Sequence, residues 1–203
     1  MHYDKSKLIM TGTTTVGIVC KDGVVLATES QATMGNLVAS TAAPKIHRIT
    51  DKIAVTISGS VADCQHVVDT LKANLALLKL ELGRDVSVKA AARLTSLILF
   101  QNRLFPYISM LIIGGVDGTG PHIFTLDPMG SLIEEDKFGA TGSGSVIAFG
   151  ILEDEYHDGI LVEEAAKLAE RAIRAARSRD VASGGTIQIC KITSNGIEEL
   201  KIE

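Results

Sequence analysis

The sequence predicts an α+β fold in which two mainly antiparallel sheets are covered by pairs of helices. Segments rich in β-branched residues alternate with longer segments whose apolar residues recur at helical spacing. Their order is strands, two helices, strands, two helices, strands. Short turns join consecutive strands, which favours antiparallel pairing. Two sheets with a helix pair on each outer face would bury all of these apolar faces.

The segment after the first dozen residues predicts two pairs of strands. Residues 13–20 and 24–28 are rich in Thr, Val and Ile, and the turn residues Lys21-Asp22-Gly23 join them. A polar loop is expected at residues 29–33. The second pair is predicted at residues 45–49 and 52–58, with Thr50-Asp51 as its turn.

Two consecutive helices follow. Ser60 with Asp63 resembles a capping box at the start of the first helix, and Gly83 ends that helix. Ser87 begins the second helix and Pro106 stops it. The apolar residues of the second helix spread widely around its axis, so we expect this helix to be well buried. They are Val88, Ala91, Leu94, Leu97, Ile98 and Leu104.

The second half repeats the order of strands and then helices. Strands are predicted at residues 107–113, 122–126 and 131–134, with a glycine-rich turn at residues 114–120. Helices are predicted from the Gly142–Ser145 segment to about Leu152, and from Val162 to Ser178; strands at 186–192 and 197–202 close the chain. The sequence contains no linker or repeat, so we expect a single domain.

Composition excludes several classes of function. Hydrophobic residues make up 46% of the 203 residues, enough for a sizeable core. The net charge of −4 gives no basic face for nucleic acid. Aromatic residues are only 4%, with no Trp, which argues against base-stacking platforms. The longest apolar run near the N-terminus is too short for a signal peptide, and none reaches the roughly 18 residues of a membrane span. We therefore expect a soluble, cytoplasmic protein.

The cysteines and histidines predict neither disulfides nor a metal site. The cysteines, Cys20, Cys64 and Cys190, are odd in number and far apart, so we interpret them as small buried hydrophobes. The five His residues are scattered without ligand spacing. No metal and no organic cofactor are expected.

Gly12 and Thr13 lie between a short polar leader, residues 1–11, and the strand-rich chain. A threonine hydroxyl can cut a Gly–Thr bond because Gly12 has no side chain to shield its carbonyl. Cleavage would leave Thr13 a free α-amine with an ordinary pKa of about 7.7–8.0. That amine could take the hydroxyl proton. Taken alone, three consecutive threonines are more typical of a strand surface, so the hypothesis depends on the rest of the chain.

Seven short motifs occur in a specific order. They are Gly-Thr-Thr-Thr-Val-Gly at 12–17, Ala-Thr-Glu-Ser-Gln-Ala-Thr-Met-Gly at 27–35, Lys45, Ser-Gly-Ser at 58–60, Ile-Gly-Gly-Val-Asp at 113–117, Ala-Thr-Gly-Ser-Gly-Ser at 140–145 and Arg-Asp-Val-Ala-Ser-Gly-Gly at 179–185. In this order and spacing the chain resembles the β subunit of the 20S proteasome, most closely the archaeal type, over nearly its whole length. The resemblance implies a four-layer αββα sandwich, the N-terminal-nucleophile hydrolase fold. It also implies a propeptide, residues 1–12, and a single catalytic domain, residues 13–203.

The resemblance implies a catalytic role for six residues. Thr13 matches the nucleophile released at the Gly12–Thr13 cleavage site, Lys45 the lysine beside it, and Glu29 the carboxylate that orients this lysine. Many relatives have Asp in place of Glu29. A neighbouring ammonium lowers the pKa of an amine, so either the Thr13 amine or Lys45 could be the base. Asp180, Ser143 and Ser183 match the hydrogen-bonding cluster around the terminal amine.

Other residues match positions that bind substrate. Gly59 matches the oxyanion donor. An extended peptide would be held through the backbone of Thr33, Gly59 and Val61. Ile57 matches the floor of the pocket for the side chain before the cut, with the small Ala32 and Ala43 nearby, so a preference for hydrophobic residues is predicted. Many relatives have arginine at the position of Gln31. This difference is expected to change the rate of the reaction more than its mechanism.

The leading hypothesis is a threonine endopeptidase that degrades unfolded proteins. Its implied partners are proteasome α subunits, other β subunits in homo-heptameric rings and, indirectly, an ATP-dependent regulatory unfoldase. Two alternatives stay open: a β-type ring subunit without catalysis, and a different N-terminal-nucleophile amidohydrolase acting on small amides. Each residue alone also has a plainer interpretation. Lys45 could be a solvated lysine, Glu29 a strand-end charge, Asp180 a turn residue, and Gly142–Ser145 a helix cap or phosphate cradle.

Overall fold

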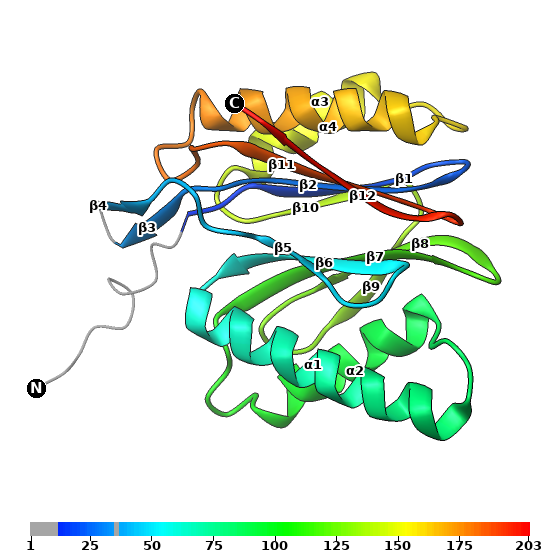
Figure 1. Cartoon of the computed structure of the whole chain (residues 1–203). Coiled ribbons are helices and arrows are strands. Elements are labelled where there is room, and N and C mark those ends of the chain that lie inside the picture. Colours follow the sequence, from blue (N-terminus) through cyan, green and yellow to red (C-terminus); the bar gives the residue numbers. More distant parts are fainter. Residues whose placement is uncertain (1–11, 35–36) are drawn as a thin grey trace, which may run out of the picture.

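Two five-stranded sheets lie face to face, and each is covered on its outer side by a pair of helices (Figure 1). The computed structural model describes residues 12–34 and 37–203. The first sheet has the strand order β10-β1-β2-β11-β12 and the second β5-β6-β7-β8-β9. Neighbouring strands in both sheets are antiparallel. The predicted fold class, a four-layer αββα sandwich, is confirmed.

The elements have the following bounds. The strands are β1 Thr15–Val19, β2 Gly23–Glu29, β3 Ala32–Met34, β4 Leu37–Ser40, β5 Ile46–Arg48, β6 Ile53–Gly59, β7 Ser109–Asp117, β8 Gly120–Leu126, β9 Leu132–Glu135, β10 Phe138–Thr141, β11 Ile187–Thr193 and β12 Gly196–Ile202. The helices are α1 Val61–Leu82, α2 Val88–Gln101, α3 Ser145–Glu155 and α4 Val162–Arg177.

The central strands are buried on both faces because each sheet lies between helices and the other sheet. Along β2, Val25 and Ala27 pack in the cluster beneath α3 and α4, whereas Val24 and Leu26 pack in the cluster between the sheets. This alternation follows from the period of two in a strand. A third cluster joins β6 and β7 to α1 and α2. Continuous apolar strands are therefore expected in this fold.

The helix ends follow the capping signals only in part. Ser60 accepts a hydrogen bond from the Asp63 backbone N–H at 3.5 Å, and Gly83 ends α1 in the left-handed conformation at φ 65°. Asp63 does not complete the capping box, because its carboxylate accepts from the Ile108 backbone N–H. Ser87 caps α2 by accepting from the Ala90 backbone N–H at 3.2 Å.

Several local predictions were wrong. Strand β10 was not predicted, and β7 continues through Gly114 and Gly115 to Asp117, where only a turn was expected. The predicted loop at residues 29–33 holds the end of β2 and the start of β3, which pairs with β4. Helix α2 ends at Gln101, and Leu104 beyond it is 82% exposed rather than buried.

Other predictions were confirmed or lie beyond the described residues. Cys20, Cys64 and Cys190 are free and buried, as predicted. The predicted propeptide, residues 1–12, lies outside the described part of the chain except for Gly12. Among the helices that the structure describes, none has the length and hydrophobicity needed to cross a membrane.

Candidate active site

Thr13 lies just before β1, the strand between β10 and β2 in the first sheet. The predicted strand began at Thr13, but strand geometry begins only at Thr15. A tight turn at the end of β10 holds Thr13 instead: the Thr13 carbonyl accepts from the Gly144 N–H at 3.4 Å. Gly142 makes this close approach possible. Its φ is +90°, and a Cβ there would lie 2.1 Å from the Thr13 carbonyl oxygen.

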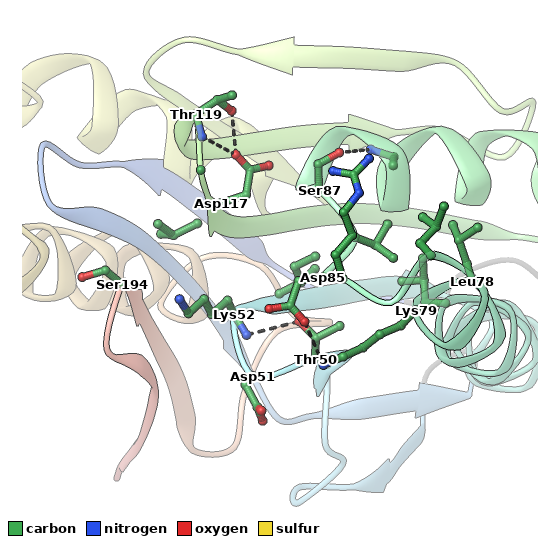
Figure 2. Close-up of a pocket in the computed structure, with 18 residues that line it drawn as sticks. Thr50, Asp51, Lys52, Leu78, Lys79, Asp85, Ser87, Asp117, Thr119 and Ser194 are labelled. Carbon is green, nitrogen blue, oxygen red and sulfur yellow. Dashed lines mark hydrogen bonds and ion pairs between the residues drawn. The ribbon is translucent and has the colours of Figure 1, made fainter.

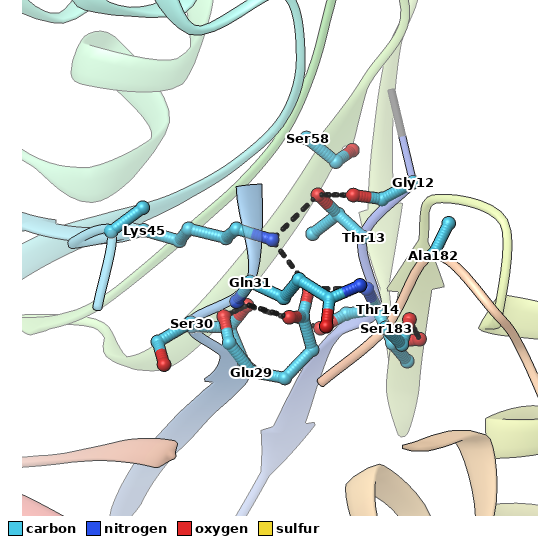
Figure 3. Close-up of polar contacts among 12 residues, drawn as sticks. Gly12, Thr13, Thr14, Glu29, Ser30, Gln31, Lys45, Ser58, Ala182 and Ser183 are labelled. Atoms are coloured by element: carbon cyan, nitrogen blue, oxygen red, sulfur yellow. Dashed lines mark hydrogen bonds and ion pairs between the residues drawn. The ribbon is translucent and has the colours of Figure 1, made fainter. Parts of the chain in front are cut away.

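The Thr13 hydroxyl lies between an amine and the peptide bond that precedes it. Lys45 Nζ donates to Thr13 Oγ1 at 2.9 Å, and Thr13 Oγ1 donates to the Gly12 carbonyl oxygen at 2.6 Å (Figure 3). All three residues are buried. A nucleophile within hydrogen-bond reach of a basic group is the geometry that activated hydroxyls require.

Lys45 is held between the two sheets by its backbone. Its N–H donates to the side-chain oxygen of Gln188 in β11 at 3.1 Å, and its carbonyl accepts from the Ile57 N–H in β6 at 2.9 Å. The side chain then extends toward Thr13. Because one backbone contact comes from each sheet, the packing of the sheets fixes the position of the amine.

Glu29 forms a buried ion pair with Lys45 and is itself completely buried. Its carboxylate accepts from four donors. They are Lys45 Nζ, the Thr14 N–H at 3.3 Å, the Gln31 N–H at 2.6 Å and the Gly184 N–H at 3.1 Å. These four donors replace the hydrogen bonds that the carboxylate would make to water. The Glu at this position is therefore accommodated by its surroundings.

The pKa of Lys45 is lowered from its ordinary value. Burial is the largest cause because it disfavours the charged ammonium, and the nearby Glu29 carboxylate opposes it in part. A lowered pKa raises the fraction of Lys45 that is neutral near pH 7. Neutral Lys45 can accept a proton from the hydroxyl that it contacts.

Asp180 binds two serines, and one of them contacts the backbone nitrogen of Thr13. Ser143 and Ser183 each donate to Asp180 Oδ2 at 2.6 Å. Ser143 Oγ also accepts from the Thr13 N–H at 3.3 Å. Ser183 Oγ lies 2.7 Å from the hydroxyl of Thr14. The cluster expected from the sequence therefore lies together, and Thr14 joins it.

A small cavity of about 40 Å³ opens beside Thr13. Thr13 and Lys45 line it, together with four of the residues expected to bind substrate: Ala43, Ile57, Gly59 and Val61. Pro44, Ser58, Cys64 and Gln65 also line it and were not predicted. Cys64 and Gln65 lie in the first turns of the helix that follows Gly59, and this position could have predicted that they lie near the site. Burial raises the pKa of the Cys64 thiol to about 11, so this thiol stays protonated and weakly nucleophilic.

Thr33 and Ala32 lie apart from this cavity. The Thr33 hydroxyl accepts from the Gly12 N–H at 3.2 Å, a side-chain contact that was not expected. Ala32 pairs with Ser40 in the β3–β4 hairpin and does not line the cavity. Gln31, where many relatives carry arginine, donates its side-chain amide to the Val181 carbonyl at 3.2 Å. Gln31 carries no charge, and the cation that pairs with Glu29 is Lys45.

A larger cavity of about 600 Å³ lies elsewhere and contains none of the predicted site residues (Figure 2). Among its charged groups, Lys79 pairs with Asp85 at 2.7 Å, and Asp117 accepts from the Thr119 N–H at 2.8 Å. Within the described ranges, no three His, Cys, Asp or Glu side chains are grouped as a metal would require.

The layered fold is the N-terminal-nucleophile hydrolase fold. In it, a threonine just before the first strand faces a buried lysine that lies between the two sheets. The family model described as "Proteasome subunit" matches residues 9–192. Proteasome subunit beta of Ferroglobus placidus is 51% identical over 203 residues, which is all of this chain and 95% of that protein. Those of Methanohalophilus mahii and Archaeoglobus fulgidus are each 50% identical, over 94% and 92% of this chain and 90% and 88% of their own. The chain belongs to the proteasome subunit family, and its similarity is to archaeal β subunits.

Proposed function

We propose that the chain is a threonine endopeptidase subunit of a 20S proteasome core particle. Thr13 acts as its N-terminal nucleophile after self-cleavage of the Gly12–Thr13 bond. One observation carries the proposal: Thr13 Oγ1 lies 2.9 Å from Lys45 Nζ and 2.6 Å from the carbonyl oxygen of Gly12.

Self-cleavage uses Lys45 as base. In the uncut chain the Thr13 nitrogen belongs to an amide and cannot accept a proton at neutral pH, whereas the pKa of the Lys45 amine is lowered. Lys45 takes the hydroxyl proton, and the Thr13 oxygen attacks the Gly12 carbonyl carbon. The C–N bond breaks, the Thr13 nitrogen takes up a proton, and water hydrolyses the resulting ester to free Gly12 and the Thr13 hydroxyl.

Cleavage turns the Thr13 nitrogen into an α-amine beside Asp180 and Ser143. Both this amine and Lys45 then lie close enough to serve the hydroxyl as base. Gly59, at the end of β6, presents its backbone N–H as the oxyanion donor, a contact of a kind worth about 3–4 kcal/mol in the transition state. A peptide substrate is cut by the same attack of the Thr13 oxygen, on the substrate's own carbonyl carbon.

The small cavity beside Thr13 supports a preference for hydrophobic residues before the cut. Ile57, Ala43 and Val61 give it apolar walls. Fluorogenic peptides ending in Leu or Tyr are expected to be cut faster than those ending in Arg or Asp. The opposite order would overturn this assignment of the pocket.

Family membership supports the proposed partners. They are proteasome α subunits and other copies of this β subunit, arranged as two β heptamers between two α heptamers. An ATP-dependent unfoldase supplies unfolded proteins to the particle, which is cytoplasmic. The proposed propeptide is residues 1–12 and the catalytic domain residues 13–203.

The test compares assembled particles containing the wild-type chain, Thr13→Ala or Thr13→Ser. Wild-type particles should hydrolyse peptides, and Thr13→Ala particles should not. Thr13→Ser, which keeps a hydroxyl, should retain measurable activity. Equal hydrolysis by wild type and Thr13→Ala would refute the proposed nucleophile, and no hydrolysis by either would favour a ring subunit without catalysis.

A further inference from the structure

Gly12 is buried against Ala182, in the loop between α4 and β11 (Figure 3). A Cβ built on Gly12 would lie 1.6 Å from the Ala182 Cβ, 2.7 Å from its Cα and 2.9 Å from its carbonyl oxygen. Contacts below 3.0 Å are essentially never made by a real Cβ. The methyl group of Ala182 therefore occupies the space that a side chain at position 12 would need.

Two hydrogen bonds fix Gly12 as well. Its N–H donates to the Thr33 hydroxyl at 3.2 Å, and its carbonyl accepts from the Thr13 hydroxyl at 2.6 Å. The residue before the nucleophile is thus held at both its backbone nitrogen and its carbonyl oxygen, with Ala182 against its Cα. A carbonyl held in this way is kept in place for attack.

The position of Ala182 is set by the cluster that serves Thr13. The Ala182 N–H donates to Asp180 Oδ1 at 3.2 Å, while Asp180 Oδ2 accepts from Ser143 and Ser183. Ala182 does not line the small cavity beside Thr13. Its side chain therefore contacts the residue before the cut without contributing to the proposed substrate pocket.

We propose that Ala182 is a positioning residue for self-cleavage, which selects glycine at position 12 and keeps the Gly12 carbonyl against the Thr13 hydroxyl. This inference rests on the proposed function. It implies a division of roles: once residues 1–12 have left, the methyl group of Ala182 has no contact with the reacting bond. A larger residue at position 182 should slow processing while leaving peptide hydrolysis by a pre-cut chain unchanged.

The first experiment is a double-mutant cycle on processing. Precursors carrying Gly12→Ala, Ala182→Gly or both are assembled with α subunits, and the appearance of the mass of residues 13–203 is timed. Gly12→Ala should slow processing about 100-fold, because a displacement of about 1 Å can cost that much. The double variant should recover at least about tenfold, since the nearest clash is gone and only the backbone contacts remain. Ala182→Gly alone should stay within about threefold of wild type.

Val181→Gly is the matched control, because Val181 is the adjacent residue and its side chain is 88% exposed. It loosens the same loop without removing the methyl group over Gly12, so Gly12→Ala with Val181→Gly should remain slow. Equal recovery with Val181→Gly, or no recovery with Ala182→Gly, would overturn the proposal.

The second experiment separates processing from hydrolysis. Chains beginning at Thr13 are released from an N-terminal fusion partner by that partner's own protease. With this start, Ala182→Val should hydrolyse peptides within about threefold of wild type, although the Ala182→Val precursor is processed slowly. A matching loss of peptide hydrolysis would overturn the proposal, because Ala182 would then act on the catalytic cluster. A wild-type precursor that is never processed would instead refute the proposed function itself, and this inference with it.

Discussion

Replacing Glu29 with Gln should destabilise the chain in a way that depends on pH. The substitution keeps the shape of the side chain but removes the negative charge beside Lys45, and neither residue is solvated. In the wild-type chain, backbone N–H groups donate to the Glu29 carboxylate. In the variant, these donors would face the NH₂ group of the carboxamide, which cannot accept from them. Breaking a buried ion pair by removing one partner costs about 3–5 kcal/mol. We expect a loss of this size in the free energy of unfolding at pH 6.

The loss should shrink as the pH rises. Without Glu29, the folded-state pKa of Lys45 falls further below its unfolded value of about 10.4, because the strongest influence that opposes burial is gone. Between these two pKa values the unfolded chain binds more protons, so the stability of the variant rises with pH. Keeping a lysine neutral costs about 1.4 kcal/mol per pH unit below 10.4, so this cost shrinks toward pH 9, and wild type shares part of it because its own Lys45 pKa is lowered.

Urea unfolding of the isolated subunit at pH 6 and pH 9 measures both values. A Thr13→Ala background keeps residues 1–12 attached in every chain. Adding Lys45→Met to Glu29→Gln should recover most of the loss, since the double variant leaves no unpaired charge. A loss below about 1 kcal/mol at pH 6, or one that grows toward pH 9, would refute this account of the ion pair.

Two further predictions concern the nucleophile and its support. Lys45→Arg keeps the charge but cannot act as a base, so processing should fall by about 10²–10⁴ while assembly persists. The wild-type processing rate, followed by mass from pH 6 to pH 9, should rise with pH, and a flat or falling profile would count against Lys45 as the base of self-cleavage. Gly142→Ala should lower the free energy of unfolding by about 1–3 kcal/mol and slow processing at least about tenfold, because its Cβ would lie 2.1 Å from the Thr13 carbonyl oxygen. Gly118→Ala, with nothing within 4 Å of the added Cβ, should change neither, and equal effects at the two glycines would contradict the argument.

Periodicity and capping signals predicted the layers and the helix pairs because both depend on burial along one element. The buried stripe of α4 was found in this way, including Ala165, Ala169 and Ile173. Strand β10 was missed because its four residues pair with β1 from more than a hundred positions away, and no local pattern records such a partner. The exposed Leu104 was misjudged because helical spacing shows where apolar residues lie but not where the helix ends.

The candidate site was predicted by its motifs rather than by local chemistry. Thr13, Lys45 and Asp180 are far apart in sequence, and only their shared resemblance placed them together. The side-chain contact of Thr33 with Gly12 and the approach of Ala182 were beyond prediction, because both depend on how separate loops meet. Cys64 was recognised as buried, but its place beside the nucleophile depends on how α1 packs against β6.

The measurement that tests the central claim most directly is the intact mass of the chain, alone and after assembly with α subunits, beside Thr13→Ala. We predict that the assembled wild-type chain loses residues 1–12 and begins at Thr13, whereas Thr13→Ala keeps its full mass. Processing that occurs only after assembly would make assembly the activating step. A wild-type chain that keeps its full mass in the assembled particle would contradict self-activation and leave a structural ring subunit.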